Sequence, residues 1–460
     1  MRTEKDSIGE LKLPDNVYYG IQSFRASQNF PVSGTQVHPE LIRSYLLLKR
    51  AAATANAHSG ALKEPLKRAI VKAIDKLLGG NPVRHFIVDA YQAGAGTSQN
   101  MNCNEVIANL ANEILGHGLG TYDPIHPNDH VNMSQSTNDT YPTAMRLAAL
   151  SLSRNLVKEL KALAISLKRK SREFDKVIKS GRTHLQDAVP IRLGQEFAAY
   201  ETTLSQLVEL IEAARDHLRE LGIGGSAVGT GVNVPRGYRK SILKELQRLF
   251  KEPGLRPARD LRAAMQSQLP MMVYSNALRA ASLELTRIVN DLRLLSSGPS
   301  TGLAEILLPS TQPGSSIMPG KVNPSILEMA NQVLFKVLGN DTAMAYAMQA
   351  GQLELNVMMP LMSQVALEST EILTNMLGLV RTKCIDGIKA NQERCRQYAE
   401  QTAAMATALN PVLGYSKAAE LTKQALKESK SIVDLVRDQA LLTENQIKTL
   451  LNPKKLTEPR

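Results

Sequence analysis

The chain has 460 residues, 43% of them hydrophobic and 21% charged, which is typical of a globular protein with two or three domains. Aromatic residues make up only 4% and tryptophan is absent, so the core must be aliphatic, which favours packed helices over sheets. We therefore expect an all-α fold. The net charge of +12 is spread singly along the chain, which argues against nucleic-acid binding and leaves a solvated basic surface or small anionic substrates.

Cysteine content and the first residues predict the compartment. Cys103, Cys384 and Cys395 form no CxxC pair, and an odd number of cysteines predicts reduced thiols rather than disulfides or a zinc site. The sequence opens Met-Arg-Thr-Glu-Lys-Asp, which lacks the apolar run of a signal peptide, and no window approaches the ~18 apolar residues of a membrane span. We predict a cytoplasmic protein with no cofactor, no nucleic-acid partner and no membrane partner.

Three domains are expected along the chain. Residues 1–138 have short apolar runs and a Gly-rich stretch at 93–96, which predict a mainly helical N-terminal domain. Residues 139–393 are dominated by helical periodicity and predict a domain of long packed helices. Residues 394–460 predict a small helical C-terminal domain.

The central helices are predicted from apolar residues spaced three and four apart. Three such series run over 152–167, 197–211 and 278–295, and each marks one face of a long helix. Two more stretches, 324–350 and 361–390, are also helical, but their apolar residues are too dense for a single stripe. We expect these two helices to be buried on more than one side, in a bundle interior or a subunit contact.

Three polar, turn-rich segments interrupt the helices, at 126–142, 181–190 and 309–324. Each lies at the end of a long predicted helix. Because parallel or antiparallel long helices bring such ends together, segments far apart in the sequence can build one pocket.

The first segment has two interpretations. It can be a helix cap, with the leucine-rich helix beginning just after Pro142. It can also bind a carboxylate, because Ser136, Thr137 and Asn138 would place neutral donors at a helix N-terminus. His126 and His130 are spaced as metal ligands can be, but a proline lies between them and no third ligand is apparent, so we expect no metal.

The other two segments offer an acid or base, a cation and hydroxyls. His184 has a side chain that can act as acid or base near neutral pH, although a lone loop histidine is more often a structural hydrogen-bonding group. In the third segment Ser315 or Ser316 supplies a hydroxyl, Lys321 a positive charge and Asn323 an amide. The alternative for this segment is a flexible linker between helices.

These segments, taken together, resemble a known family. The stretch Gly-Ser-Ser-Ile-Met-Pro-Gly-Lys-Val-Asn-Pro at 314–324 resembles the signature of the fumarase/aspartase superfamily. Residues 126–140 and Thr-His-Leu-Gln-Asp at 183–187 resemble its other conserved blocks in the same order, and the likeness runs over nearly the whole chain. The combination narrows the resemblance to aspartate ammonia-lyases or class II fumarases.

Within that pair the resemblance favours the aspartate ammonia-lyases. The stretches 95–102, 290–299 and 351–357 are similar to the aspartase forms, whereas Thr140 is the residue that fumarases carry. Ser300 replaces an arginine that both groups commonly have. Class II fumarase is therefore the alternative, and a catalytically silent protein like the lens crystallins of this superfamily is a third possibility.

The resemblance implies a β-elimination that gives fumarate through a dianionic aci-carboxylate. It implies that Ser315 is the base and that Lys321 and Asn323 hold the carboxylate that becomes doubly charged. His184 would contact the substrate and pair with Glu328. The carboxylates and leaving group would be bound by Thr97, Ser136, Thr137, Asn138 and Thr183.

The resemblance also implies architecture and assembly. We expect three mostly helical domains, a central five-helix bundle and a homotetramer in which each active site takes its segments from different subunits. In fumarases the stretch that corresponds to 126–130 forms a second anion site, and whether it binds anything here is open.

Overall fold

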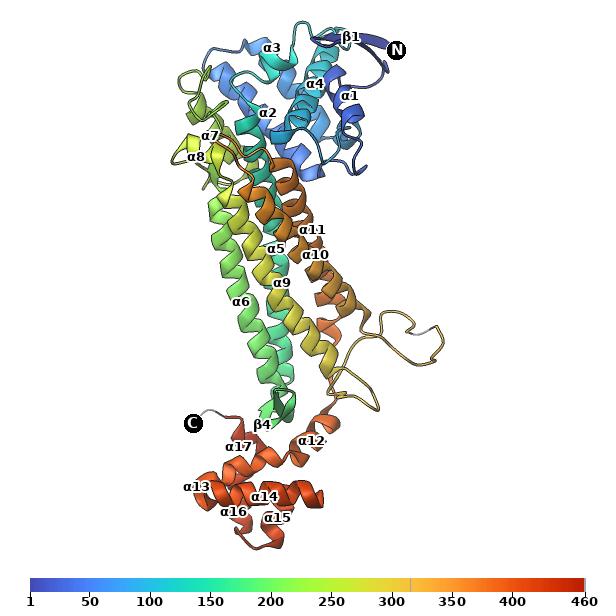
Figure 1. Cartoon of the computed structure of the whole chain (residues 1–460), viewed down its shortest axis with the longest axis vertical. Helices are drawn as coiled ribbons and strands as arrows, with labels where there is room; N and C mark the ends of the chain where they lie inside the picture. The colour runs from blue at the N-terminus through green and yellow to red at the C-terminus, as the bar shows by residue number, and fades with distance from the viewer. Residues whose placement is uncertain (315, 459–460) are drawn as a thin grey trace. The chain divides into compact units, whose positions relative to one another are not determined.

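The computed structural model describes residues 1–314 and 316–458, and its regular structure is mostly helical (Figure 1). No helix of the described residues is both long enough and apolar enough to cross a membrane. The α-helices are α1 Ile21–Asn29, α2 Pro39–His58, α3 Glu64–Leu78, α4 Thr97–Ile114, α5 Thr137–Glu173, α6 Leu193–Leu218, α7 Tyr238–Phe250, α8 Leu261–Gln266, α9 Leu269–Leu295, α10 Ser325–Gln349, α11 Met359–Lys383, α12 Gln392–Gln401, α13 Asn410–Leu413, α14 Tyr415–Glu428, α15 Ile432–Asp438, α16 Glu444–Leu450 and α17 Pro453–Leu456.

Short strands pair into two-stranded sheets. The pairs are β1 Arg2–Asp6 with β2 Gly9–Leu13, β3 Ile178–Thr183 with β4 Gln186–Arg192, β5 Glu220–Leu221 with β6 Arg256–Pro257, and β7 Ile306–Leu307 with β8 Lys389–Ala390. All are antiparallel except β5 with β6. These strand pairs therefore hold loops in place and do not form a sheet layer of the fold.

Five long helices confirm the predicted all-α architecture. Helix α5 has 37 residues, α6 has 26, α9 has 27, and α10 and α11 have 25 each. They fall in the five stretches predicted as helical, although the stretch predicted over 361–390 ends as a helix at Lys383 and continues into strand β8. The stripe on α5 is buried as the spacing requires, since Leu156, Leu160 and Leu167 are at most 1% exposed.

The predicted start of the leucine-rich helix was wrong. Helix α5 begins at Thr137, and Pro142 lies inside it rather than before it. A proline this close to the helix start removes one intrahelical hydrogen bond but leaves the first turn intact. The cap at Ser136 fixes that first turn, so the polar segment from Thr137 onward is helical.

The chain divides into two compact units, each formed by three segments. Unit 1 comprises Met1–Val157, Glu209–Ser282 and Phe335–Thr374, and unit 2 comprises Lys158–Val208, Leu283–Leu334 and Asn375–Arg460. Every internal boundary falls within one of the five long helices, so each long helix contributes one part to each unit. The domain boundaries expected from the sequence, after residues 138 and 393, stay a prediction.

In unit 1, helix α4 lies buried among α1, α2 and α3 although it is rich in asparagine. The buried asparagines are satisfied by neighbouring backbone: Asn102 bonds Ile87 and His85, Asn109 bonds Gly120 and Tyr18, and Asn112 bonds Ile125 twice. Because a buried amide is costly unless it is bonded, these side chains hold the surrounding loops in one conformation.

In unit 2, the short helices α13 to α16 gather into one cluster (Figure 1). Its core is aliphatic and includes Leu409, Leu421, Leu435 and Val436, each at most 2% exposed. Helix α12 packs against strand β3 of the hairpin that carries the second polar segment.

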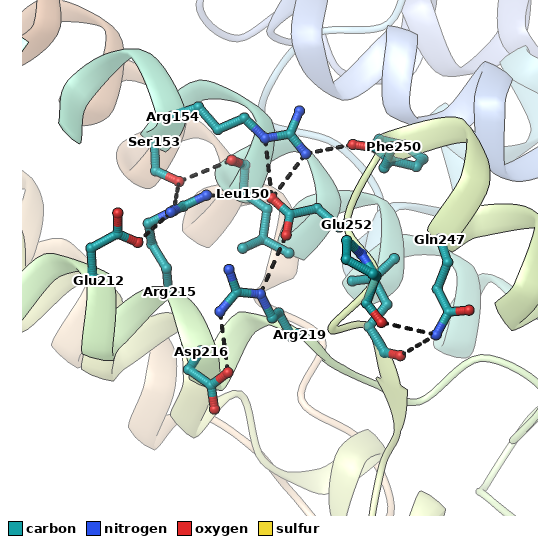
Figure 2. Close-up of polar contacts among 12 residues, drawn as sticks. Leu150, Ser153, Arg154, Glu212, Arg215, Asp216, Arg219, Gln247, Phe250 and Glu252 are labelled. Carbon is teal, nitrogen blue, oxygen red and sulfur yellow. Dashed lines mark hydrogen bonds and ion pairs between the residues drawn. The ribbon is translucent and has the colours of Figure 1, made fainter. Parts of the chain in front are cut away.

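A cluster of charges in unit 1 joins α5, α6 and the turn after α7 (Figure 2). The Glu252 carboxylate is 6% exposed and lies 2.8 Å from Arg154 Nη2, 3.3 Å from Arg215 Nη2 and 3.3 Å from Arg219 Nε. Arg154 also donates to the Phe250 carbonyl. Three guanidinium groups around one carboxylate leave the buried charge fully paired.

Candidate active site

The N-terminus of α5 carries the first group of predicted site residues in unit 1. The Ser136 hydroxyl oxygen accepts a hydrogen bond from the Asn138 amide at 3.2 Å, and the Asp139 carboxylate accepts from the Ser136 amide at 3.0 Å. The Ser136 side chain therefore caps the start of α5, so the capping interpretation is confirmed for Ser136. Because the Ser136 oxygen accepts from the backbone, its hydroxyl proton can still donate to a ligand.

Asp139 holds a glycine-rich loop against this helix end. Its second carboxylate oxygen accepts from the amides of Gly224 at 3.0 Å and Ser226 at 2.9 Å, and Asn138 Nδ2 donates to the Ala227 carbonyl at 2.8 Å. Asp139 is fully buried, and burial raises its pKa to about 6. The backbone around Ser136 to Asn138 is therefore fixed from two sides.

Thr97 lies beside the same helix end, at the start of α4. The residue before it, Gly96, has a φ of 82°, and a Cβ at this glycine would overlap the Tyr141 ring of α5. One turn further along α4, Asn100 Nδ2 donates to Thr137 Oγ1 at 3.1 Å. These contacts place the start of α4 beside the start of α5, and a pocket shared by Thr97 with Ser136, Thr137 and Asn138 stays a prediction.

The chemistry of this helix end suits a carboxylate. Thr137 Oγ1 accepts from Asn100, so its own proton is available to a ligand, as for Ser136. The helix dipole adds positive potential at this end of α5. Thr97 is exposed and lines a cavity of about 550 Å³ that Arg25, Met101 and His126 also line.

The two histidines before α5, His126 and His130, accept hydrogen bonds from backbone amides. His130 Nδ1 accepts from the His126 amide at 2.9 Å, and His126 Nδ1 accepts from the amides of Asn128 and Asp129 at 3.3 Å. Within residues 1–314 and 316–458, no group of three or more His, Cys, Asp or Glu side chains is placed to hold a metal ion. Each imidazole therefore uses one ring nitrogen as the acceptor for amides of its own loop.

The second segment forms the turn of the β3–β4 hairpin in unit 2. His184 and Leu185 are the two central residues of this turn, with φ values of 56° and 59°, and both side chains are exposed, as is Thr183. Two successive non-glycine residues in the left-handed region are strained, and such strain gathers at functional sites. The sequence had predicted only a turn-rich segment here.

A buried ion network anchors this hairpin. Glu305 is fully buried, and its carboxylate lies 2.8 Å from Arg182 Nη1 and 3.1 Å from Lys179 Nζ, while Lys179 Nζ also lies 2.8 Å from Glu196. Arg182 directly precedes Thr183. The network thus fixes the strand that leads into the His184 turn, and it ties that strand to the chain just before the third segment.

The third segment lines a cavity of about 470 Å³ in unit 2. Lys321 and Asn323 line it together with residues of the 296–308 loop, among them Pro299, the neighbour of Ser300. Ser315, the predicted base, lies outside the described residues.

Glu328 occupies the first turn of α10 and is half-buried. Among the described residues it makes no hydrogen bond or ion pair with His184. Their pairing stays a prediction, because it was expected in an assembly of several subunits.

Sequence reasoning missed several residues that organise the site. Asp139 had a signal, since it stands three residues after a capping serine. Asn100, which bonds Thr137, and Asn132, which accepts from Asn100, had a weaker one, an unusual density of asparagine in and near a helix that must be buried. Lys49 of α2, whose Nζ donates to Asn132 and Gln135, had none, because a single lysine in an apolar helix looks like a solvated surface residue.

Comparison with family models defines the class of protein to which the chain belongs. Residues 9–339 match a family model described as lyase, and residues 405–458 match one described as the fumarase C C-terminus.

Similarity to individual proteins then covers the whole chain. Aspartate ammonia-lyases of Bacillus subtilis and Helicobacter pylori strain J99 are each 47% identical, with 100% of this chain and 96% and 98% of theirs covered. Among solved structures, a Brucella melitensis protein described as fumarate lyase:delta crystallin bound to cobalt superposes with a TM-score of 0.97 at 45% identity, over 100% of both chains. Class II fumarase of Schistosoma mansoni gives 0.96 at 34%, over 100% of this chain and 99% of that one. The chain belongs to the fumarase/aspartase superfamily of lyases.

Proposed function

We propose that this chain is an aspartate ammonia-lyase, which converts L-aspartate into fumarate and ammonia. The observation that carries the proposal is its 47% identity to the Bacillus subtilis aspartate ammonia-lyase over the full chain, against 34% to the class II fumarase of Schistosoma mansoni. Class II fumarase, acting on L-malate, is the second candidate because Thr140 is the residue that fumarases carry.

In the proposed reaction the alkoxide of Ser315 removes a proton from the β-carbon of L-aspartate and becomes the hydroxyl. The electron pair moves into the neighbouring carboxylate and makes it a dianion, which Lys321 and Asn323 stabilise. The dianion then collapses to the double bond of fumarate, and the C–N bond electrons leave with the substrate's ammonium group as ammonia.

The remaining residues bind and orient the substrate in this proposal. Thr97, Ser136, Thr137, Asn138 and Thr183 hold the carboxylates and the leaving group, and His184 contacts the substrate and is oriented by Glu328. Support comes from the described geometry at the start of α5, where the hydroxyls of Ser136 and Thr137 accept bonds from the protein and keep their protons for an anion.

The direct test is the ultraviolet absorbance of fumarate produced by the purified protein. Fumarate from L-aspartate supports the proposal, and fumarate only from L-malate supports the hydratase. No fumarate from either substrate points to another succinyl lyase or to a silent binding protein.

Replacing the proposed base gives a sharper test. Ser315→Ala should lower kcat by roughly 100-fold or more, since general base catalysis contributes at least that much, while the quaternary structure and Tm stay unchanged. Ser316→Ala is the matched control, because Ser316 has the same side chain one residue on and is exposed. Loss of turnover in Ser316→Ala alone would transfer the role to Ser316.

We further propose a cytoplasmic homotetramer with active sites shared between subunits. Several large apolar side chains on the long helices are exposed in the single chain, including Ile165 at 69%, Leu283 at 51%, Phe335 at 55% and Tyr346 at 68%. Other copies of the chain would cover them. The three cysteines are buried and unpaired, which supports a reducing compartment. Light scattering measures the number of chains in the assembly.

A further inference from the structure

Lys49 is a buried cation close to the start of α5, the segment proposed to bind a carboxylate. It lies on α2, is 1% exposed, and its Nζ donates to Asn132 Oδ1 and Gln135 Oε1, both at 3.0 Å. Both partners are neutral amides. Burying an ammonium group without a carboxylate at hydrogen-bonding distance is costly, so this arrangement calls for an explanation.

The charged and titratable groups around Lys49 do not neutralise it. Asp139 of α5 is the neighbouring acid, but its carboxylate is bound by the amides of Ser136, Gly224 and Ser226. Cys103 of α4 also faces the lysine, and burial raises the pKa of its thiol to about 12. Burial lowers the pKa of Lys49 itself to about 8.

A short chain of hydrogen bonds connects Lys49 to a predicted substrate-binding hydroxyl. Asn132 Oδ1 accepts from Lys49 Nζ and, at 3.1 Å, from Asn100 Nδ2, and the same Asn100 nitrogen donates to Thr137 Oγ1 at 3.1 Å. Asn104 Nδ2 is a third donor to Asn132, at 3.2 Å. Lys49 and Asn100 therefore share the Asn132 oxygen as acceptor, and the bond from Asn100 to Thr137 Oγ1 leaves the Thr137 proton available to a ligand.

We propose that Lys49 is a positioning residue for the dicarboxylate site, and that its positive charge, which has no acid at hydrogen-bonding distance among the described residues, strengthens binding of the substrate's carboxylate at the start of α5. This inference rests on the proposed function, because it takes Ser136 to Asn138 to bind a dicarboxylate. A positive charge kept below a helix N-terminus adds to the helix dipole rather than cancelling it. An arrangement required only for folding would place an acid at hydrogen-bonding distance from the lysine, and Asp139 is not at that distance.

The test is calorimetric titration with succinate, a dicarboxylate that lacks the amino group, does not react and keeps both carboxylates ionised above pH 7. For the intact wild-type protein we expect the Kd to rise by about tenfold as the pH increases through the pKa of Lys49, because the positive charge near the bound carboxylate is lost. For Lys49→Met we expect a Kd about tenfold higher at pH 7 and independent of pH up to 9.

Two further variants separate charge from packing. Lys49→Arg keeps its charge at every pH, so its succinate affinity should stay constant while that of the wild type falls. Lys72→Met removes an exposed helical lysine of α3 and should bind succinate as the wild type does.

Each outcome decides the inference. Equal affinity and equal pH dependence in Lys49→Met and wild type would overturn it, as would a wild type that does not bind succinate. If Lys49→Met does not fold, the wild-type titration decides, because a Kd that does not change with pH overturns the proposal. Fumarate formation from L-aspartate is measured separately. Lys49-dependent succinate binding without that activity would retain the inference and reject the proposed reaction.

Discussion

Two buried charges in unit 1 differ in how they are paired. Glu252 is 6% exposed and surrounded by three arginines (Figure 2). Lys49 is 1% exposed and bonded to two amides. The first arrangement satisfies a carboxylate completely and joins three elements of the fold. The second leaves a cation without an acid and lies against the proposed binding segment. A buried charge with a structural role needs a full set of partners, whereas a buried charge at a ligand site can lack one.

Unit 2 repeats this contrast. Glu305 is fully buried and contacts Lys179 and Arg182, and this network holds the strand that leads to His184. Lys321, by comparison, is exposed and lines a cavity. In both units the paired charges stabilise the fold, and the predicted substrate-binding residues lie in neighbouring segments.

The largest effect is expected from removing the fully paired acid. Glu252→Ala leaves Arg154, Arg215 and Arg219 without their common partner, and Arg215 is itself buried. We expect a loss of about 3–5 kcal/mol in the free energy of unfolding, measured by denaturant titration. A loss below about 1 kcal/mol would contradict the structural role given to this cluster.

A smaller and pH-dependent effect is expected at Lys49. Its pKa is about 8 in the folded chain and, by reference to free lysine, about 10.4 in the unfolded chain. Between these values the unfolded chain binds more protons, so folding becomes more favourable as the pH rises. The wild type should therefore gain up to about 3 kcal/mol relative to Lys49→Met over this range.

The measurement for Lys49 is a series of denaturant titrations on both proteins at increasing pH. Their difference isolates Lys49 from every group that the two proteins share. At pH 7 the Lys49→Met variant should be about as stable as the wild type, because the lost hydrogen bonds and the relieved desolvation of the charge oppose each other. A constant difference at all pH values would show that Lys49 has an ordinary pKa.

The smallest effect is expected at an exposed pair on α7. Glu245 lies 2.8 Å from Arg248, whose side chain is 59% exposed, so solvent screens the interaction. Glu245→Ala should change the free energy of unfolding by about 0.5 kcal/mol or less in the same titration. A loss comparable to that of Glu252→Ala would mean that burial does not separate the two classes of ion pair.

Several features were predictable because they depend on local chemistry. Apolar stripes predicted three of the five long helices and dense apolar stretches the other two, and the run Ser136-Thr137-Asn138 predicted donors at a helix end. The signature around Lys321 predicted the family. Each of these signals lies within about twenty consecutive residues, where periodicity and motif spacing carry the information.

Other features depend on contacts between residues far apart in the sequence. The true start of α5 depends on Asp139, whose carboxylate binds the amides of Gly224 and Ser226 as well as Ser136. The left-handed turn at His184 depends on a hairpin whose base is held by Glu305. No local pattern specifies such partners.

By itself the sequence determined the helical class of this protein, its superfamily and the residue types that a dicarboxylate lyase needs, because these follow from periodicity, composition and short motifs. Tertiary structure alone decided that Lys49 is buried without an acid while Glu252 is enclosed by arginines. Burial and pairing depend on which helices pack together, and a single lysine or glutamate in the sequence does not indicate which residues will be its neighbours in space.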